Sequence, residues 1–408
     1  MYLENIELKG KKVLVRVDFN VPLNKEYKVT DDTRIRSALP TIEYILKQGA
    51  AVVLMSHLGR PQKKTKEDGT VDKERFTLNH TVACLSKLLG QPVAFAGDTI
   101  GKVAKDAVEA LNMGEVLILE NTRFYQEEKK GDQEFARQLA DLADVYINDA
   151  FGTAHRAHAS TCTVAQFFDK AHRGFGFLIK KELESAQKLT NNPARPFTAI
   201  VGGAKVSDKI LLLEKLVDSV DHIIIGGGMA YTLIKAQGGT VGSSLLEEDK
   251  LEVARALLAK AAEKGVEILL PEDSVVADAF DNNAKTQIIA SKAIPEGWMG
   301  LDIGNQAIEK FAAVVTNSKS LVWNGPMGVF EMSSFANGTA QIAEAVVEAT
   351  QKGAFSLIGG GDSVAAINKA GKADQVSFVS TGGGAMLKLL EGGVLPGVAA
   401  ITDELTVE

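Results

Sequence analysis

Arginine and other polar side chains stand after the apolar runs in the first half of the chain. The residues concerned are Arg16, Asp18, Asn20, His57, Arg60, Arg123, His155, Arg156 and His158, and Arg34 lies in the predicted helical turn after "TDDT". The planar guanidinium group matches the oxygens of carboxylate and phosphate, so converging arginines suit a small polyanion. A single arginine is more often a solvated surface charge. Four at equivalent positions favour an anion site, whereas the histidines lack the surroundings of a metal site.

Glycine takes the same place in the second half, where four apolar runs end on it. The runs are "FTAIVGGAK", "HIIIGGGMA", "FSLIGGGDS" and "SFVSTGGGA". Glycine lets backbone N–H groups approach a phosphate or a flat ring, and a helix that begins just beyond adds its positive end. For any single run, a tight strand-to-helix turn without a ligand is the alternative. None has the spacing of a P-loop or a dinucleotide-binding fingerprint, which argues against both of those enzyme classes.

Charged side chains near these glycines are typical of phosphate binding. Lys205 and Lys209 are four residues apart, which puts both on one helical face if a helix begins there. Asp362 stands at the start of another predicted helix, as an N-cap, a magnesium ligand or both. Glu331, in "LVWNGPMGVFE", offers a carboxylate to ribose hydroxyls, although the segment is equally compatible with a turn beside a buried tryptophan.

The two halves therefore predict two ligands, a small anionic metabolite in the first and a nucleotide with Mg²⁺ in the second. No Ser-His-Asp or Cys-His set indicates covalent catalysis. Phosphoryl transfer needs positioning and neutralisation of charge, which these residue types supply. Two domains with one ligand each further predict closure about a hinge, which brings donor to acceptor and excludes water.

Short apolar runs that alternate with amphipathic stretches must position these residues. Ten runs are typical of buried parallel strands, namely "KVLVRVDF", "AAVVLMS", "EVLILEN", "DVYINDA", "FTAIV", "HIIIG", "EILLP", "SLVWN", "FSLIG" and "VSFVS". The alternation predicts an α/β fold with two doubly wound, Rossmann-like parallel sheets, in which ligands bind beyond the carboxyl ends of the strands. The segment "FGFLIKKELESAQKL" predicts a hinge helix that joins the two domains, with the boundary between residues 172 and 196.

Composition sets the remaining limits. The chain has 408 residues and a formal net charge of −7, which indicates two domains and argues against general nucleic-acid binding. No apolar run is long enough to span a membrane and the first residues do not form a secretory signal, so the cytoplasm is expected. Cys84 and Cys162 are isolated, and we expect both to be reduced.

Over nearly its whole length the sequence resembles the phosphoglycerate kinase family. The segments that carry the resemblance are "RVDFNVP", "TRIR", "SHLGRP", "ENTRF", "INDAFGTAHRAHAST", "GGAKVSDKI", "GGGMA", "WNGPMGVFE", "GGGDS", "STGGGA" and "LPGV", in the family's order. The resemblance implies reversible, Mg²⁺-dependent phosphoryl transfer from 1,3-bisphosphoglycerate to ADP, which yields 3-phosphoglycerate and ATP in glycolysis.

The resemblance also implies a role for each matching residue. Those expected to bind 3-phosphoglycerate are Asp18, Phe19, Asn20, Arg34, His57, Leu58, Gly59, Arg60, Arg123 and Arg156. Those expected to bind the nucleotide are Lys205, Lys209, Gly227, Gly228, Asn324, Pro326, Glu331, Gly360, Gly361, Asp362 and Ser363, with Mg²⁺ on Asp362. The catalytic set around the transferred phosphoryl group is Arg34, Lys205, Lys209, Gly361 and Gly384.

The same resemblance implies a monomer with a substrate domain and a nucleotide domain. We expect the N-terminal domain to comprise residues 1–173 and 390–408, because the family's C-terminal tail returns to it, and the C-terminal domain to comprise residues 174–389. Two alternatives remain at this stage. One is another nucleotide-dependent enzyme on the same frame, and the other is a catalytically silent binding protein, which the presence of Arg34, Lys205, Lys209 and Asp362 disfavours.

Overall fold

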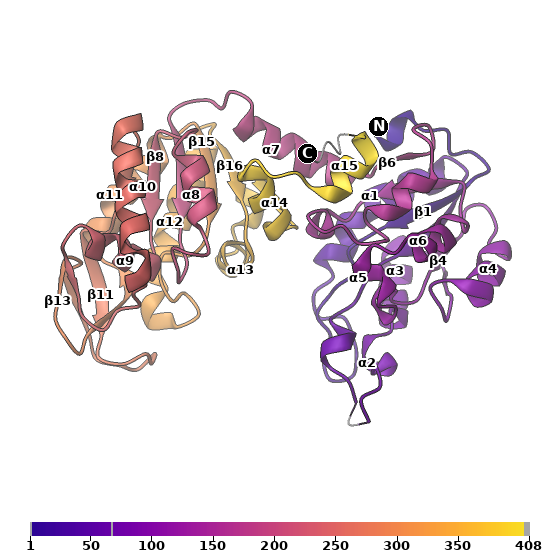
Figure 1. Cartoon of the computed structure of the whole chain (residues 1–408), viewed down its shortest axis with the longest axis horizontal. Helices are drawn as coiled ribbons and strands as arrows, with labels where there is room; N and C mark the ends of the chain where they lie inside the picture. Colours follow the sequence, from indigo (N-terminus) through magenta and orange to yellow (C-terminus); the bar gives the residue numbers. More distant parts are fainter. Residues whose placement is uncertain (1, 67, 404–408) are drawn as a thin grey trace. The chain divides into compact units, whose positions relative to one another are not determined.

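The chain divides into two compact units in the computed structural model, which describes residues 2–66 and 68–403. Unit 1 comprises Met1–Glu184 and Val394–Glu408, and unit 2 comprises Ser185–Gly393. The helix α7 (Phe177–Thr190) runs across the boundary (Figure 1). In the described part of the chain, no helix combines the length and apolar character needed to cross a bilayer.

Unit 1 is built on one parallel sheet with the strand order β3-β4-β2-β1-β5-β6. Its strands are β1 (Lys12–Arg16), β2 (Ala51–Met55), β3 (Val93–Phe95), β4 (Val116–Ile118), β5 (Val145–Asn148) and β6 (Arg173–Phe175). The order changes direction at β1, which pairs with β2 on one side and with β5 on the other. Ligands of open α/β sheets bind at such a switch point, beyond the carboxyl ends of the strands.

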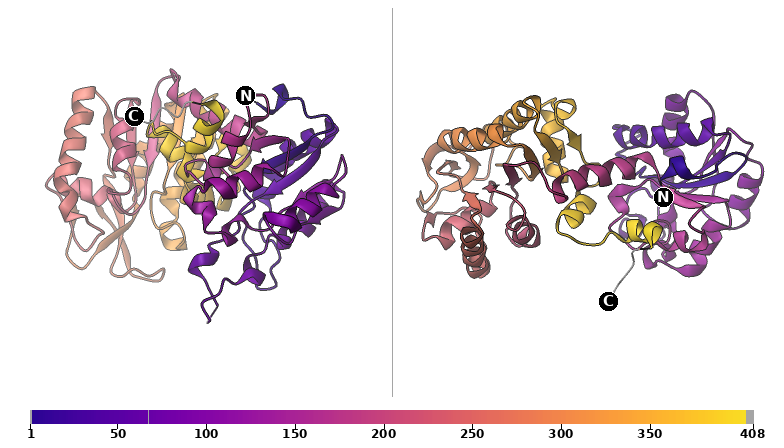
Figure 2. Two further views of the ribbon diagram at one scale, coloured as in Figure 1. Left: turned by 45° about the vertical axis from the view of Figure 1, so that its right-hand side comes forward. Right: turned by 90° about the horizontal axis from the view of Figure 1, so that it is seen from above.

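Helices cover this sheet, as the views in Figure 2 show. The helices of unit 1 are α1 (Thr33–Lys47), α2 (Lys73–Phe76), α3 (Asn79–Leu89), α4 (Gly101–Glu109), α5 (Glu127–Lys130), α6 (Gln133–Ala140) and the start of α7, and the short α2 lies away from the sheet (Figure 1). The helix α1 shows why the sequence folds this way, because Ile35, Ala38, Ile42 and Ile45 recur at helical spacing and all are buried. They pack in one core with strand residues of β1 and β2.

The last described residues of the chain belong to unit 1. The helix α15 (Pro396–Thr402) lies beside β6 (Figure 1). The Asn148 side-chain amide donates to the Gly397 carbonyl at 3.1 Å. Asp403, which ends α15, forms ion pairs with Lys170 at 2.9 Å and with Arg173. These contacts fix the C-terminal segment to strand β5 and the residues around β6.

Unit 2 contains a second six-stranded parallel sheet, with the order β10-β8-β7-β15-β16-β17. Its strands are β7 (Phe197–Val201), β8 (His222–Ile225), β10 (Glu267–Leu269), β15 (Ser320–Asn324), β16 (Phe355–Ile358) and β17 (Phe378–Val379). This is the 3-2-1-4-5-6 order of dinucleotide-binding folds, with its switch point between β7 and β15. In unit 1 the fourth strand, β4, lies between β3 and β2, whereas in unit 2 the fourth strand of the sheet, β15, lies beside β7. The two halves therefore share their layers but not their full topology.

Two small sheets and seven helices complete unit 2. The strands are β11 (Asp273–Ala277), β12 (Thr286–Ala290) and β14 (Met299–Ile303), which are antiparallel, with β9 (Thr240–Val241) and β13 (Ala293–Ile294) as a separate pair. The helices are α8 (Ile210–Leu216), α9 (Met229–Ala236), α10 (Leu251–Lys264), α11 (Asn305–Asn317), α12 (Asn337–Gln351), α13 (Gly361–Lys369) and α14 (Gly383–Leu390).

The predicted α/β fold with two doubly wound parallel sheets is confirmed, and all ten predicted strands are present. The strands β3 and β6, the small antiparallel sheet and the pair β9 and β13 were not predicted. The strand β12 is mostly exposed, so it lacks the continuous apolar run on which the prediction relied. The strands β3 (VAF) and β6 (RGF) lie outside any longer apolar run, since β3 is only partly buried and β6 contains an arginine and a glycine.

Candidate active site

In unit 1 the segments that follow β1, β2 and β4 are joined at the peptide groups of Gly59. The Asn20 side-chain oxygen accepts a hydrogen bond from the Gly59 N–H at 2.7 Å. The Arg123 guanidinium donates to the Gly59 carbonyl at 2.8 Å. Three residues that the sequence predicted as ligand-binding, from three strand ends, therefore lie within one hydrogen-bonded group.

Arg34, at the start of α1, extends this group. Its Nη1 donates to the Asp18 carboxylate at 3.1 Å and to the Asn20 carbonyl at 3.0 Å. The side chain of Arg34 is 39% exposed, while that of Asp18 is 11% exposed. Asp18 thus holds the guanidinium at the strand ends while other N–H donors stay open to a ligand.

His57 and Arg123 are buried among several cationic groups. Burial lowers the pKa of His57 well below its usual value, and Arg16, Arg123, Arg34 and Arg156 lower it further. Burial also lowers the pKa of Arg123 to about 10, with Arg16 and Arg156 adding to the effect. The groups act on one another in this way because their positive charges lie close together, and a bound anion would relieve the repulsion.

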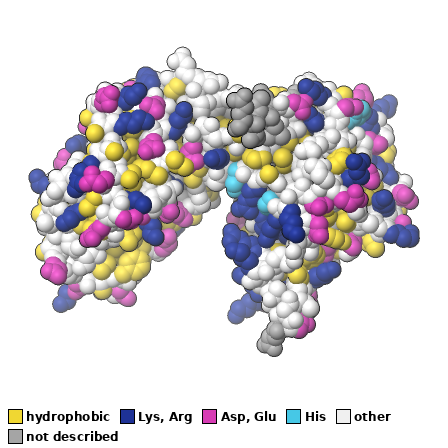
Figure 3. Space-filling view, in the orientation of Figure 1, with side chains coloured by type: hydrophobic (Ala, Val, Ile, Leu, Met, Phe, Trp, Pro, Cys, Tyr) yellow, Lys and Arg dark blue, Asp and Glu magenta, His cyan; other side chains and the backbone are white. Residues whose placement is uncertain are grey.

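Further cations surround this centre. Burial lowers the pKa of Lys129, and Arg123, Lys63, Arg60 and Arg156 lower it further, which places these five cations near one another. Figure 3 shows Lys, Arg and His side chains gathered on one side of unit 1. The sequence analysis did not include Lys63 or Lys129, whose lysine-rich segments look like ordinary solvated surface.

Not every predicted residue presents its side chain to a ligand. Phe19 is fully buried in the core, and its backbone N–H donates to the Ser56 hydroxyl at 2.8 Å. Leu58 is 3% exposed, and its N–H and carbonyl are both bonded to the Asn121 side chain, at 3.2 and 2.8 Å. Ser56 and Asn121, which the sequence analysis also missed, shape the loop that carries His57 and Arg60.

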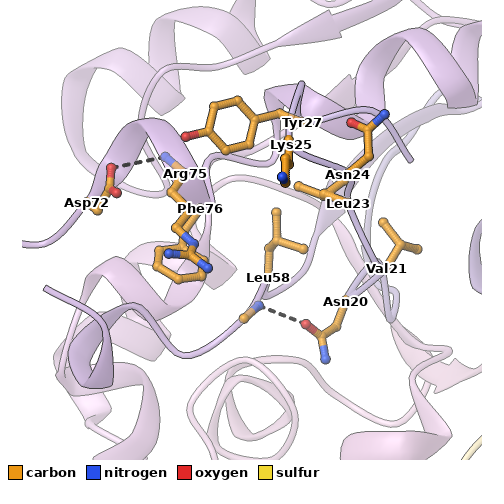
Figure 4. A pocket seen from close by; sticks show the side chains of 11 residues that line it. Asn20, Val21, Leu23, Asn24, Lys25, Tyr27, Leu58, Asp72, Arg75 and Phe76 are labelled. Carbon is orange, nitrogen blue, oxygen red and sulfur yellow. Dashed lines mark hydrogen bonds between the residues drawn. The ribbon is translucent and has the colours of Figure 1, made fainter. Parts of the chain in front are cut away.

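A cavity of about 650 Å³ adjoins the Asn20–Gly59 hydrogen bond. Figure 4 shows Phe76 and Arg75 together on one side of it, with Tyr27 and Lys25 above it and Leu58 below. Phe76 also explains the glycine at position 59, because a Cβ there would lie 2.5 Å from its ring. The Phe76 ring therefore packs directly against Gly59 and sets the position of the loop whose peptide groups form the Gly59 hydrogen bonds.

Unit 2 contains a cavity of about 470 Å³ at the carboxyl ends of its central strands. Five residues predicted to bind a nucleotide line it, namely Gly227, Gly228, Pro326, Glu331 and Asp362. The sequence analysis did not predict its apolar wall, formed by Tyr231, Leu245, Phe280, Met299, Leu301, Met327 and Val329. A concave site with glycine backbone on one side and apolar side chains on the other suits a flat ring that carries phosphates.

The glycines bring neighbouring strand-end loops into direct contact. A Cβ on Gly227, whose φ is +69°, would lie 2.7 Å from the Gly203 carbonyl oxygen. A Cβ on Gly325 would lie 2.0 Å from the carbonyl oxygen of Gly202. These positions exclude larger residues because backbone packs on backbone, which the sequence analysis did not foresee.

Lys209 and Ser363 attach to the loop that follows β15. The Lys209 ammonium donates to the Asn324 side-chain oxygen, and the Asn324 amide donates to the Gly359 carbonyl at 2.9 Å. The Ser363 hydroxyl accepts from the Gly325 N–H at 2.5 Å. Burial lowers the pKa of Lys209, whereas Asp362, Asp208 and Glu391 raise it.

Two helix N-termini also meet in this region. The helix α13 begins at Gly361 and α14 at Gly383. A Cβ on Gly383 would lie 2.7 Å from the Gly360 Cα, so the two starts are adjacent. The predicted residues Gly360, Gly361 and Gly384 therefore lie where the positive ends of two helices come together.

The structure corrects two expectations from the sequence. Lys205 and Lys209 do not share a helical face, because α8 begins only at Ile210 and Lys205 lies in the preceding loop. Glu247 holds that loop open by accepting from the Ser207 N–H at 3.0 Å and its hydroxyl at 2.6 Å. Asp362 is not an N-cap, because Gly360 has that position and Asp362 lies in the first turn of α13.

Comparison with known proteins decides the family. The family model for phosphoglycerate kinase matches residues 3–393. The chain belongs to the phosphoglycerate kinase family. It is 50% identical to a phosphoglycerate kinase of Porphyromonas gingivalis, covering 98% of this chain and 100% of the relative, and 54% identical to a cytosolic phosphoglycerate kinase of Triticum aestivum, covering 98% of each. The solved phosphoglycerate kinase structure from Coxiella burnetii is 39% identical, covers 99% of each chain and superposes with a TM-score of 0.87.

The resemblance to phosphoglycerate kinase that the sequence motifs indicated is thus confirmed. Phosphoglycerate kinases are phosphotransferases of glycolysis that use a carboxyl group as acceptor, and this chain is an enzyme of that class.

Proposed function

We propose that this phosphoglycerate kinase binds 3-phosphoglycerate on unit 1 and MgATP or MgADP on unit 2, and transfers the phosphoryl group directly and reversibly. The observation that supports this division most strongly is the contrast between the two sites. Unit 1 offers buried and half-buried cations at its strand ends, and unit 2 offers a glycine-walled cavity with an apolar side. A small polyanion suits the first site and a nucleotide the second.

On unit 1, the proposed contacts to 3-phosphoglycerate come from Arg34, Arg60, Arg123 and Arg156, with His57 as a neutral donor. Asp18 and Asn20 orient Arg34 and the Gly59 peptide through the hydrogen bonds described above. Phe19 and Leu58 act by shaping the loops that carry Asp18 and His57, because their side chains are buried and their N–H groups donate to Ser56 and Asn121. Several fixed cations around one small ligand orient it as well as bind it.

On unit 2, the adenosine lies against the apolar wall beside Gly227, Gly228 and Pro326, and Glu331 accepts from the ribose hydroxyls. Mg²⁺ in proteins is commonly held by one or two carboxylates together with substrate phosphates. Asp362 fits that pattern, since its carboxylate lines the cavity beside the glycine loops. The metal, when bound, neutralises charge on the phosphate oxygens.

For transfer to ADP, an oxygen of the ADP β-phosphate attacks the 1-phosphorus of 1,3-bisphosphoglycerate in line, and the carboxylate of 3-phosphoglycerate leaves. Lys209, Lys205 and Arg34 stabilise charge on the phosphoryl group, and Gly361 and Gly384, in the first turns of α13 and α14, add N–H donors. The two ligands must meet, so we propose closure about α7, which crosses the unit boundary. We further propose that the enzyme acts as a monomer in the cytoplasm.

A coupled assay tests the proposal with purified protein, ADP, 1,3-bisphosphoglycerate and Mg²⁺. We expect ATP formation that stops when Mg²⁺ is chelated and resumes when it is restored. Folded protein that forms no ATP under these conditions would refute the activity. Sedimentation of the active protein at the assay concentration tests the monomer.

A further inference from the structure

A chain of buried hydrogen bonds leads from α5 to the anion site of unit 1. Glu128, which is fully buried, accepts from the Ser160 N–H at 2.9 Å and from the Ser160 hydroxyl at 2.6 Å. The Ser160 oxygen in turn accepts from the Arg16 Nε–H at 2.8 Å. A hydroxyl has one proton, and Ser160 gives it to Glu128, so the oxygen that faces Arg16 must be an acceptor.

The chain continues from Arg16 to His57. Arg16 is fully buried, and its Nη2 lies 3.1 Å from the His57 Nδ1. A guanidinium group only donates, so Nδ1 accepts and has no proton of its own. The ring proton of a neutral His57 therefore lies on Nε2. The pKa of His57 is lowered by burial and by Arg16, Arg123, Arg34 and Arg156, which favours this neutral form. Asp18 is the carboxylate nearest to Nδ1, at 4.0 Å.

The buried positive charge of Arg16 explains why a carboxylate is buried at position 128. Among the residues that the structure describes, Arg16 forms no direct ion pair with a carboxylate. A buried charge without compensation is destabilising by several kcal/mol. Glu128 supplies the opposite charge, and the hydroxyl of Ser160 lies between the two ions. This hydroxyl donates to Glu128 and accepts from Arg16.

We propose that Glu128 is a positioning residue which, through Ser160 and Arg16, holds His57 as the Nε2–H tautomer so that its ring donates to an anionic oxygen of the substrate. The assignment of the Nε2–H tautomer follows from the hydrogen bonds alone. The claim that this N–H donates to the substrate rests on the proposed function. Glu128 lies outside the motifs from which site residues were predicted. The sequence gives only "EEKKG", which reads as a short exposed helix.

The variant Glu128→Gln tests the direction of the hydrogen bonds with little change in shape. Glutamine has one acceptor oxygen, so it cannot accept from both the N–H and the hydroxyl of Ser160 in the same geometry. If its NH₂ faces the hydroxyl, the Ser160 proton turns toward Arg16 and two donors oppose each other. Arg16 then loses its partner at Nε and keeps the bond from Nη1 to the Val17 carbonyl, so the donor to Nδ1 of His57 is held less firmly.

The measurement is the ¹⁵N spectrum of ring-labelled histidine in the full-length protein at neutral pH, with the His57 signals identified by their loss in His57→Gln. We expect an Nε2–H pattern for the wild type and a mixed or Nδ1–H pattern for Glu128→Gln. We also expect the KM for 3-phosphoglycerate to rise roughly tenfold with kcat changed much less. Asp149→Asn is the matched control, because this buried carboxylate of unit 1 bonds through its side chain to α7 N–H groups at 2.9 and 3.3 Å and should leave the His57 signals unchanged.

Two further variants keep the test decisive if Glu128→Gln does not fold. Ser160→Ala removes the link without adding a charge and should disturb the same signals, while Ser160→Thr keeps the hydroxyl and should restore them. An Nδ1–H pattern in the wild type, or wild-type His57 signals in folded Glu128→Gln or Ser160→Ala, would overturn the proposal. Because the spectrum needs no substrate, it separates this outcome from a failure of the proposed activity.

Discussion

The Lys209 ammonium donates a hydrogen bond to the side chain of Asn324, 115 positions further along the chain. Asn324 ends β15 and in turn donates to the Gly359 carbonyl after β16, so it connects a lysine with two strand-end loops. The lysine is held half-buried, in a place where burial disfavours its charge. A half-buried ammonium group of this kind interacts most favourably with negative charge that develops beside it in the transition state.

We expect Lys209→Met to lower kcat by roughly 10²–10³-fold, because a preorganised cation is lost from the transition state. The KM for 3-phosphoglycerate should change little, since that ligand is assigned to unit 1. Steady-state kinetics in both directions checks this, with Lys215→Met, in the last turn of α8, as the matched control. An unchanged kcat would show that Lys209 does not act on the transferred group.

Arg60→Gln should act on one substrate only. Arg60 is exposed among the cations of unit 1, so its loss should raise the KM for 3-phosphoglycerate by about tenfold or more and leave the KM for ATP within about twofold. Arg36→Gln, which removes an exposed arginine paired with Asp32 at 2.8 Å, should change neither value. Equal losses for both substrates of Arg60→Gln would contradict the division of ligands between the units.

Gly227→Ala should damage the nucleotide cavity. The new Cβ would lie 2.7 Å from the Gly203 carbonyl at a backbone φ of +69°, so we expect a loss of about 2 kcal/mol or more in stability and a higher KM for ADP. Calorimetry and kinetics measure the two effects. Gly97→Ala is the control, because its Cβ would meet nothing within 4 Å. Equal behaviour of the two variants would mean that the close packing of the loops is not required.

Asp149→Asn should reveal a buried titrating group. Burial raises the pKa of Asp149 to about 7 in the folded protein, from 3.8, so the folded state keeps a proton that the unfolded state releases. The stability from this group is complete below the unfolded pKa and is lost as pH rises through the folded pKa. Asparagine does not titrate. The stability of the variant relative to wild type should therefore improve with rising pH, at up to about 1.4 kcal/mol per pH unit between roughly pH 4 and 7.

Urea unfolding of both proteins across that pH range measures this difference, and the comparison cancels the other titrating groups. A difference that stays constant, or that grows in the opposite direction, would show that Asp149 is ionised in the folded protein.

Much of the site was predictable because most of its residues lie within a few positions of a strand end, where their types can be read from the sequence. His57 and Arg123 were recognised as residues that follow strands and Arg34 as a residue of the helical turn after "TDDT", and the structure places the three close together. Ser160 and Glu128 were not recognised, since their importance lies in bonds to Arg16 rather than in their own surroundings. The helix start at Ile210 was misplaced because Glu247, distant in sequence, anchors the loop before it.

The sequence by itself determined the class of the fold and the kind of residue at each strand end. Apolar runs and helical spacing reflect burial, which is a property of each segment, and they were enough to find ten strands of the two parallel sheets. Only the tertiary structure decided the strand order, the apolar wall beside the glycines, and the route from Glu128 to His57. These depend on contacts between residues far apart in the chain, and no local pattern encodes which distant segments become neighbours.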